Sequence, residues 1–168
     1  MPYTLEELSA ECHAALKQDP GPRGRKAVSL LVQKAALDAD FLARHVPADQ
    51  AEERHVLYED PELKFCILAH VYRDAKGSAP HDHGPTWAIY GQAEGTTEMT
   101  DFRVLEKPHD DQPGKVQPVH SYSLTPGTAH VYNEGVVHAP RRDGPTRLIR
   151  IEGFNLYGMV RDKFETVA

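Results

Sequence analysis

The sequence predicts an all-β domain, an antiparallel sandwich or double-sheet jelly roll, preceded by a helical segment. Apolar residues recur with helical spacing to about residue 46 and with a period of two from residue 54 onward. Turn-forming residues divide the second part into short segments at near-regular intervals, which is typical of antiparallel double-sheet folds. We therefore expect residues 1–50 to form an N-terminal helical cover and residues 51–168 to form the β-domain, in one folding unit.

Three helices are expected in the first part of the chain. Thr4 and Glu7 make a capping box that begins the first helix. The segment DPGPRG at 19–24 ends this helix, and a second apolar stripe follows over residues 28–35. A short third helix is expected to end near Pro47. Helices ahead of a β-domain most simply cover one face of a sheet.

The β-domain begins with a run of strand-like segments. KFCILAHVYR at 64–73 alternates so that Phe65, Ile67, Ala69 and Val71 share one face. The later strand-like segments, each followed by a turn or loop signal except the last, are WAIYG, TTEMTDFRVL, HSYSL, TAHVYN and TRLIRIEGFNLY.

Composition and charge exclude several classes of partner. The net charge is −6 and no cluster of Lys or Arg occurs, which argues against nucleic acid or an anionic membrane surface. No apolar run reaches the length of a membrane span, and the acidic N-terminus is unlike a signal peptide, so we expect a cytoplasmic protein. Cys12 and Cys66 predict two free thiols, although the sequence leaves a single disulfide open.

The stretch PHDHGPTW at 80–87 carries two histidines separated by one aspartate. In a chain so rich in histidine, the number of His-x-His pairs expected by chance is roughly 0.5, so the motif by itself is weak evidence for a site. Residues i and i+2 of a strand point to one side, so His81 and His83 on an extended stretch would face the interior together. A metal site would need a third ligand from a neighbouring strand.

That third ligand is offered by LTPGTAHVYNEGVVHAP at 124–140. A turn at Pro126–Gly127 precedes a strand, a turn at 133–135 ends it, and His138 follows at the start of the next strand. His130 also follows a glycine by three residues and competes for the same role.

These two stretches resemble the two sequence motifs of cupins. The second motif is a glycine turn, a short strand, a second glycine turn and a histidine, and the HDHG stretch with the later Gly95 is similar to the first motif. The resemblance implies a cupin jelly-roll barrel over residues 51–168, in which His130 would lie one strand too early. The metal ligands that it implies are His81, His83 and His138.

One departure from the cupin pattern concerns the metal. The glutamate usually found four or five residues after the second histidine is absent, since Trp87 and Ala88 stand there. The ligands would then be three neutral imidazoles, which suit iron(II) and also zinc, nickel or copper. Manganese is a further possible metal. Because no carboxylate offsets the charge of the ion, such a site favours an anionic, chelating substrate.

A narrower resemblance is to the thiol dioxygenases, meaning cysteine dioxygenase and its relatives that act on mercapto acids. The stretch KFCILAHVYRDAKGSAPHDHG is similar to that family, GVVH resembles the segment of its third ligand, and Arg54 stands where the family places the arginine that grips the substrate carboxylate. GFNLY at 153–157 resembles the family's Ser-x-His-x-Tyr segment, with Tyr157 matching the tyrosine. Gly153 and Asn155 replace the serine and histidine, and Ala88 replaces the cysteine that some members cross-link to the tyrosine.

The resemblance implies an iron(II) dioxygenase that oxidises a small thiol to its sulfinate with O2. Tyr157 would be catalytic, and the residues that would bind substrate are Arg54, Trp87 and Asn155. The alternatives are a three-histidine dioxygenase that cleaves a carbon–carbon bond in a dicarbonyl and a non-catalytic metal- or ligand-binding cupin. Cupins often pair through sheet edges, which makes a homodimer a candidate assembly.

Simpler roles remain open for the residues outside the histidine motifs. Arg54 could form a surface ion pair with Glu52 or Glu53, and Tyr157 could be a core tyrosine at the end of an apolar strand. Trp87 could pack in the barrel instead of lining a pocket.

Overall fold

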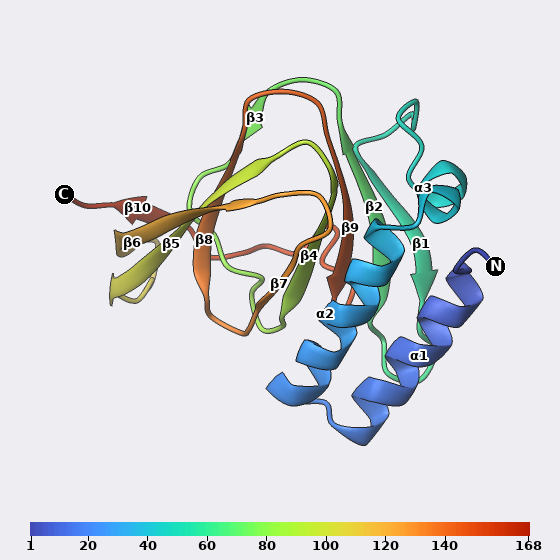
Figure 1. Cartoon of the computed structure of the whole chain (residues 1–168). Coiled ribbons are helices and arrows are strands. Elements are labelled where there is room, and N and C mark those ends of the chain that lie inside the picture. The colour runs from blue at the N-terminus through green and yellow to red at the C-terminus, as the bar shows by residue number, and fades with distance from the viewer.

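The computed structural model describes all 168 residues, as three helices followed by ten strands (Figure 1). The helices are α1 (Leu5–Gln18), α2 (Pro22–Ala36) and α3 (Ala39–His45). The strands are β1 (Arg54–Glu59), β2 (Cys66–Tyr72), β3 (Lys76–Gly77), β4 (Ala88–Glu94), β5 (Thr97–Glu106), β6 (Gly114–Leu124), β7 (Ala129–Tyr132), β8 (Val137–Arg142), β9 (Thr146–Glu152) and β10 (Phe164–Thr166).

The strands form two five-stranded sheets with the connectivity of a jelly roll. One sheet has the order β1-β2-β9-β4-β7 and the other the order β10-β6-β5-β8-β3. Strands β2 to β9 pair in nested antiparallel fashion, β2 with β9, β3 with β8, β4 with β7 and β5 with β6. This is a long hairpin rolled up into two facing sheets, so the predicted jelly roll is confirmed. The description all-β is only approximate, because the three helices belong to the same structure.

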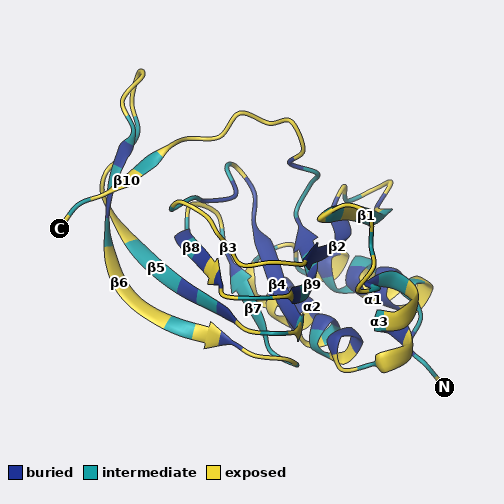
Figure 2. Ribbon diagram, turned by 90° about the horizontal axis from the view of Figure 1, so that it is seen from above, coloured by how far each residue is buried: buried dark blue, intermediate teal, exposed yellow.

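The helices cover the outer face of the first sheet, as Figures 1 and 2 show. The predicted capping box of Thr4 and Glu7 begins α1, and Asp38 caps α3 by accepting from the backbone N–H of Phe41. The alternate residues of β2 that the sequence places on one face, including Ile67 and Val71, pack against the helices in a core of 18 buried residues. The largest apolar core therefore lies outside the barrel.

The space between the two sheets is organised differently. Its buried apolar cluster has only five residues, namely Ala88, Tyr90, Met99, Leu124 and Tyr132. Many of the other buried residues between the sheets are histidine, arginine and glutamate. Stability from apolar burial is thus concentrated between helices and sheet, which leaves the barrel interior free for a polar site.

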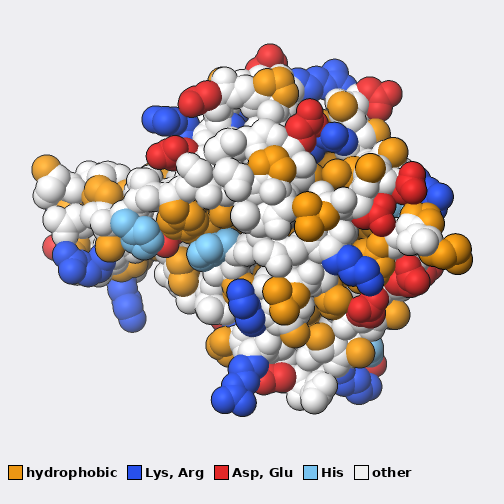
Figure 3. Space-filling view, in the orientation of Figure 1, with side chains coloured by type: hydrophobic (Ala, Val, Ile, Leu, Met, Phe, Trp, Pro, Cys, Tyr) orange, Lys and Arg blue, Asp and Glu red, His pale blue; other side chains and the backbone are white.

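Three further features bear on the predictions from sequence. Cys12 and Cys66 are both free and buried, so the disulfide that the sequence left open is not formed. None of the helices combines the length and apolar character that a membrane span requires. On the face seen in Figure 3, Lys and Arg side chains are interspersed with Asp and Glu.

Gly91 of β4 provides a test of how the helical cover is seated. A Cβ at this position would overlap Cγ1 of Val32 on α2 and lie 3.2 Å from the carbonyl oxygen of Ile149. We expect Gly91→Ala to lower the free energy of unfolding by about 1–3 kcal/mol, because the side chain of Val32 is stiff and the sheet backbone cannot give way. The measurement is urea denaturation. Gly144→Ala is the matched control, because a Cβ there meets nothing within 4 Å. Equal stability of the two variants would show that α2 does not pack tightly on β4.

Candidate metal centre

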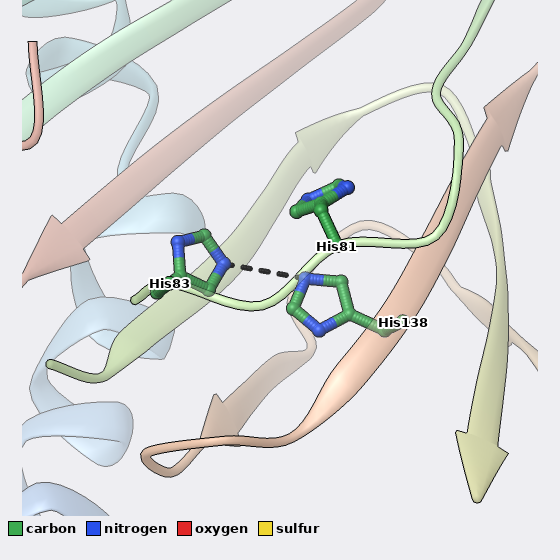
Figure 4. A group of neighbouring side chains, drawn as sticks. All are labelled: His81, His83 and His138. Atoms are coloured by element: carbon green, nitrogen blue, oxygen red, sulfur yellow. Dashed lines mark hydrogen bonds between the residues drawn. The ribbon is translucent and has the colours of Figure 1, made fainter. Parts of the chain in front are cut away.

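Three histidines from two distant segments meet inside the barrel (Figure 4). His81 and His83 lie on the irregular segment between β3 and β4, and His138 lies on β8. Two backbone hydrogen bonds of 2.9 Å, one in each direction, join His81 to His138. The sequence predicts both motif histidines on an extended stretch, and the structure provides this single bridge in place of a strand. One ligand atom of each histidine lies within 4.8 Å of those of the other two.

The imidazoles are held close to one another and to a tyrosine. Nε2 of His83 is 3.2 Å from Nε2 of His138, and the hydroxyl of Tyr90 is 3.1 and 3.4 Å from these two nitrogens. His83, His138 and Tyr90 are at most 2% exposed, and His81 is half-buried on the cavity side. Tyr90 is not among the residues that the sequence singles out for the site. It lies on the same face of β4 as Ala88, two residues before it, and both belong to the small buried cluster between the sheets.

The hydrogen bonds of the imidazoles leave nitrogen lone pairs for a cation. Nδ1 of His81 lies 2.9 Å from the carbonyl oxygen of Ala79, to which it can only donate, so Nε2 is the free lone pair. Two nitrogens bound to one ion at about 2.1 Å would be separated by about 3.0–3.4 Å, which matches the spacing between His83 and His138. The tyrosine hydroxyl has one proton and can donate to only one of these nitrogens at a time. The three residues therefore fit a divalent metal ion.

The electrostatic environment keeps these histidines neutral. Burial lowers the pKa of His81 to about 4, and the positive charges of Arg150, Arg161 and Arg142 act in the same direction. Burial, together with His81 and Arg150, lowers the pKa of His138 to about 2. Burial and His138 lower the pKa of His83 well below its usual value. Near neutral pH a metal ion would thus displace no protons from these ligands.

The structure brings His138, and not His130, to the other two histidines. His130 lies on β7, where its ring centroid is 4.5 Å from that of Tyr132 and 5.1 Å from that of Tyr122. The ring of Tyr132 in turn lies 4.2 Å from that of His138. A layer of aromatic rings therefore separates His130 from the histidine cluster.

A cavity of about 710 Å³ opens beside the histidines and is lined by His81, His83 and Tyr90. Arg54 and Tyr157, which the sequence singles out, also line it. The Arg54 guanidinium donates to Oδ1 of Asn155 at 2.7 Å and to Oε2 of Glu152 at 3.4 Å, and lies 5.8 Å from the ring centroid of Tyr157. Tyr157 is 82% exposed, so it stands at the mouth of the cavity and is not a core residue.

Two of the residues predicted to bind substrate lie differently from expectation. Trp87 belongs to the core under the helices, with the guanidinium of Arg25 5.2 Å from its ring centroid, and it does not line the cavity. The prediction that Trp87 contacts substrate is corrected by this placement, because Trp87 directly precedes β4 and lies on the same side as Ile89, which also packs against the helices. Asn155 does not line the cavity either, but it holds Arg54 and accepts from the backbone N–H of Tyr157 at 3.0 Å.

Several polar residues of the site escape the sequence analysis. Arg142 continues the face of β8 that begins with His138, and Arg150 and Glu152 share a face of β9. His70 of β2 is 4% exposed, with Nδ1 3.2 Å from the hydroxyl of Tyr72 and Nε2 without a partner. Counting two and four residues onward from His138 would have found Arg142. For His70 and Arg150, apolar neighbours on both sides hide which face points inward.

Fold and site together define a jelly-roll protein with a three-histidine candidate metal centre at the side of an open cavity. No protein-family model matches the chain, and no curated protein is significantly similar to it. Its structural neighbours include proteins described as cupins. One from Desulfitobacterium hafniense is 14% identical with a TM-score of 0.45, covering 63% of this chain and 84% of that one. A cupin-2 domain protein from Shewanella frigidimarina is 17% identical with a TM-score of 0.43, covering 61% and 80%.

KdgF from Halomonas sp. is 16% identical with a TM-score of 0.47, covering 64% of this chain and 82% of that one. These likenesses are too distant to carry an inference about the chain. Its jelly roll is defined by its own strand order and register.

Replacement of one histidine at a time tests the ligand set. We expect His138→Gln to weaken iron(II) or cobalt(II) binding by more than the 10–100-fold that loss of an outer-shell partner costs, because one of three ligands is removed. His130→Gln is the matched control and is expected to retain binding. The measurement is metal content after dialysis, supported by titration calorimetry. The reverse pattern would make His130 the third ligand.

The buried imidazole of His70 predicts a pH dependence of stability. Burial, and then the charges of Arg150, Arg54 and Arg142 and the imidazole of His83, hold its pKa well below the usual value. As the pH falls below about 6.5, His70 therefore takes up a proton in the unfolded chain but not in the folded chain. The free energy of unfolding is highest above this pH and decreases as the pH falls. The free energy of unfolding should decrease between pH 7.5 and pH 5, and we expect this decrease to be smaller by up to about 2 kcal/mol in His70→Gln.

The measurement is urea denaturation of the metal-free protein at the two pH values. His109→Gln, at an exposed loop position, is the control and is expected to leave the pH dependence unchanged. If the loss of stability is as large in His70→Gln as in the unmodified protein, His70 is not a group that causes it.

Proposed function

We propose that the chain is a cupin dioxygenase that binds iron(II) through His81, His83 and His138 and oxidises a small thiol carboxylate to its sulfinate with O2. The observation that carries this proposal is that Arg54 and Tyr157 line the same cavity as His81 and His83. Zinc, nickel or copper would also suit three imidazoles, whereas manganese prefers oxygen ligands, and iron(II) is the choice that fits the proposed oxidation with O2.

The metal, when bound, would supply the positive charge that deprotonates a thiol and the redox chemistry with oxygen. The neutral histidines leave that charge uncompensated, which favours an anionic substrate over a neutral one. The helices and the two sheets keep His83 and His138 away from bulk water, so charge interactions at the site are strong.

Arg54 is the residue suited to orient the substrate. One nitrogen of its guanidinium is engaged by Asn155 and Glu152, which fixes the side chain while the remaining donors stay available. A substrate carboxylate could accept from two of these donors at once, which would direct the thiol toward the histidines. Tyr157 would donate a hydrogen bond to the substrate from the mouth of the cavity. Asn155 takes a positioning role in place of a histidine relay.

The lining of the cavity favours this proposal over its two rivals. Cleavage of a dicarbonyl would be favoured by a wholly apolar pocket, whereas this cavity contains several arginines. A non-catalytic cupin would be favoured by a filled barrel, whereas about 710 Å³ is open beside the histidines. The volume lies within the range usual for small-molecule sites.

The proposal is tested by oxygen consumption of the iron(II)-loaded protein with cysteine, 3-mercaptopropionate, mercaptosuccinate and cysteamine. We expect iron-dependent uptake with at least one carboxylate thiol, together with formation of its sulfinate. Arg54→Gln should lower kcat/KM for that thiol about 10–100-fold, because a charge-assisted hydrogen bond of about 1.5–3 kcal/mol is lost.

Cysteamine, which has no carboxylate, serves as the substrate control, and its rate should be insensitive to Arg54→Gln. Arg103→Gln is the variant control, because this arginine is exposed on β5. Absence of iron-dependent uptake with all four thiols would exclude thiol oxidation.

A further inference from the structure

The cavity beside the histidines carries more positive than negative charge. Its lining includes five cationic side chains, Arg54, Arg142, Arg150, Arg161 and Lys163, but only two carboxylates, those of Glu152 and Asp162. The proposed function uses one of these cations, Arg54. The deepest of the others are Arg142 and Arg150, which have no part in the proposed metal site.

Arg142 is a buried cation without a counter-charge. It is 2% exposed, and its Nε and Nη2 have no hydrogen-bond partner. No carboxylate forms an ion pair with it, and its guanidinium lies 4.3 Å from the ring centroid of Tyr72. It is four residues from His138 on β8, so both side chains project to the same face at a separation of about 13 Å along the strand.

Arg150 approaches the same space from the facing sheet. It lies opposite Tyr90 in the register of β9 with β4, and its guanidinium is 4.2 Å from the Tyr90 ring centroid. Its Nε is buried without a partner. Its nearest carboxylate oxygen is that of Glu152 at 4.0 Å, and Arg54 draws on the same carboxylate at 3.4 Å. One carboxylate thus serves two arginines, and Arg142 has none.

A buried charge with unmet donors is costly unless a ligand completes it. Native proteins leave few buried polar groups without partners, and an unpaired buried charge costs several kcal/mol. A planar guanidinium presents paired donors that match the two oxygens of an oxyanion. Arg142 and Arg150 both border an open cavity, where such an anion can reach them.

We propose that Arg142 and Arg150 form a second anion site, which binds a carboxylate or phosphonate-type group of the substrate. The ligand would be a small acid with two anionic ends, one at these two arginines and the other at Arg54. The assignment of the Arg54 end rests on the proposed function. In that setting the substrate class narrows from thiol carboxylates in general to thiols that carry a second acidic group, such as mercaptosuccinate.

The first test uses the unmodified protein and measures ligand binding without any reaction. Succinate, its monoamide succinamate and 3-phosphonopropionate have similar lengths, but succinamate lacks one of the charges. Titration calorimetry, with the protein iron(II)-loaded under argon and metal-free, should show succinate or 3-phosphonopropionate binding at least tenfold more tightly than succinamate. The tighter of the two identifies the second anion as carboxylate or phosphonate. Equal affinity of all three, or no binding, overturns the proposal.

The second test assigns the effect to Arg142. Arg142→Met should abolish the preference, so that the dianion and succinamate bind with about equal affinity. Arg141→Met is the matched control, because Arg141 directly precedes Arg142 on β8 but is exposed and points the other way. It should leave the preference intact. A preference that survives in Arg142→Met overturns the assignment. If Arg142→Met does not fold, Arg142→Lys is used in its place, because lysine keeps the charge and loses the planar pair of donors. We expect this variant to show a reduced preference for the dianion.

These outcomes are separable from those of the proposed function. A tenfold preference for dianions in the binding test supports the second anion site even if no thiol is oxidised. Conversely, oxidation of 3-mercaptopropionate and mercaptosuccinate with equal kcat/KM, together with equal binding of succinate and succinamate, would retain thiol oxidation and overturn the second anion site.

Discussion

The pair of backbone hydrogen bonds between His81 and His138 is the connection on which the rest of the site depends. It joins an irregular segment to β8 at a single point, and β8 is fixed on its other side by β5, where Asp101 lies opposite His138. The backbone of His138 thus lies between a loop and a strand, which sets the height of all three imidazoles in the barrel. A loop held in this way can present His81 and His83 without the regular strand that the sequence predicts.

The first sheet can tolerate a polar inner face because its outer face is apolar. Along β9, Ile149 and Ile151 pack toward the helices while Arg150 and Glu152 line the cavity. β2 alternates in the same sense, with apolar residues under the helices and His70 on the inner face. Burial against the helices supplies free energy that offsets the cost of histidine and arginine side chains inside the barrel. The alternation of apolar and polar residues along these strands therefore produces both the face that binds the helices and the face that lines the polar site.

The sequence predicts the fold better than it predicts the lining of the site. Period-two alternation and turn residues are local patterns, and they suffice to predict an antiparallel double-sheet fold. The spacing of His81 and His83 is also local, but the choice of His138 over His130 as the third histidine depends on the resemblance to the cupin motifs. The segment WAIYG is apolar at nearly every position, so nothing in it shows that Tyr90 faces the histidines and Trp87 the helices. Polar residues of a strand usually face bulk water, but Arg150 and Glu152 face the interior of the barrel. This reversed pattern is expected in a sheet whose outer face is covered by helices and whose inner face lines a cavity.

The charges of the site couple its two proposed ligands. Arg150, Arg161 and Arg142 help to keep His81 unprotonated, yet the same positive charges oppose the arrival of a metal cation. Glu152, 3% exposed and shared between Arg54 and Arg150, offsets only part of this repulsion. A dianionic ligand would offset more of it, so the metal and the anion would each bind more tightly in the presence of the other. Under the proposed function, this reciprocity would hold the metal most firmly when substrate is present.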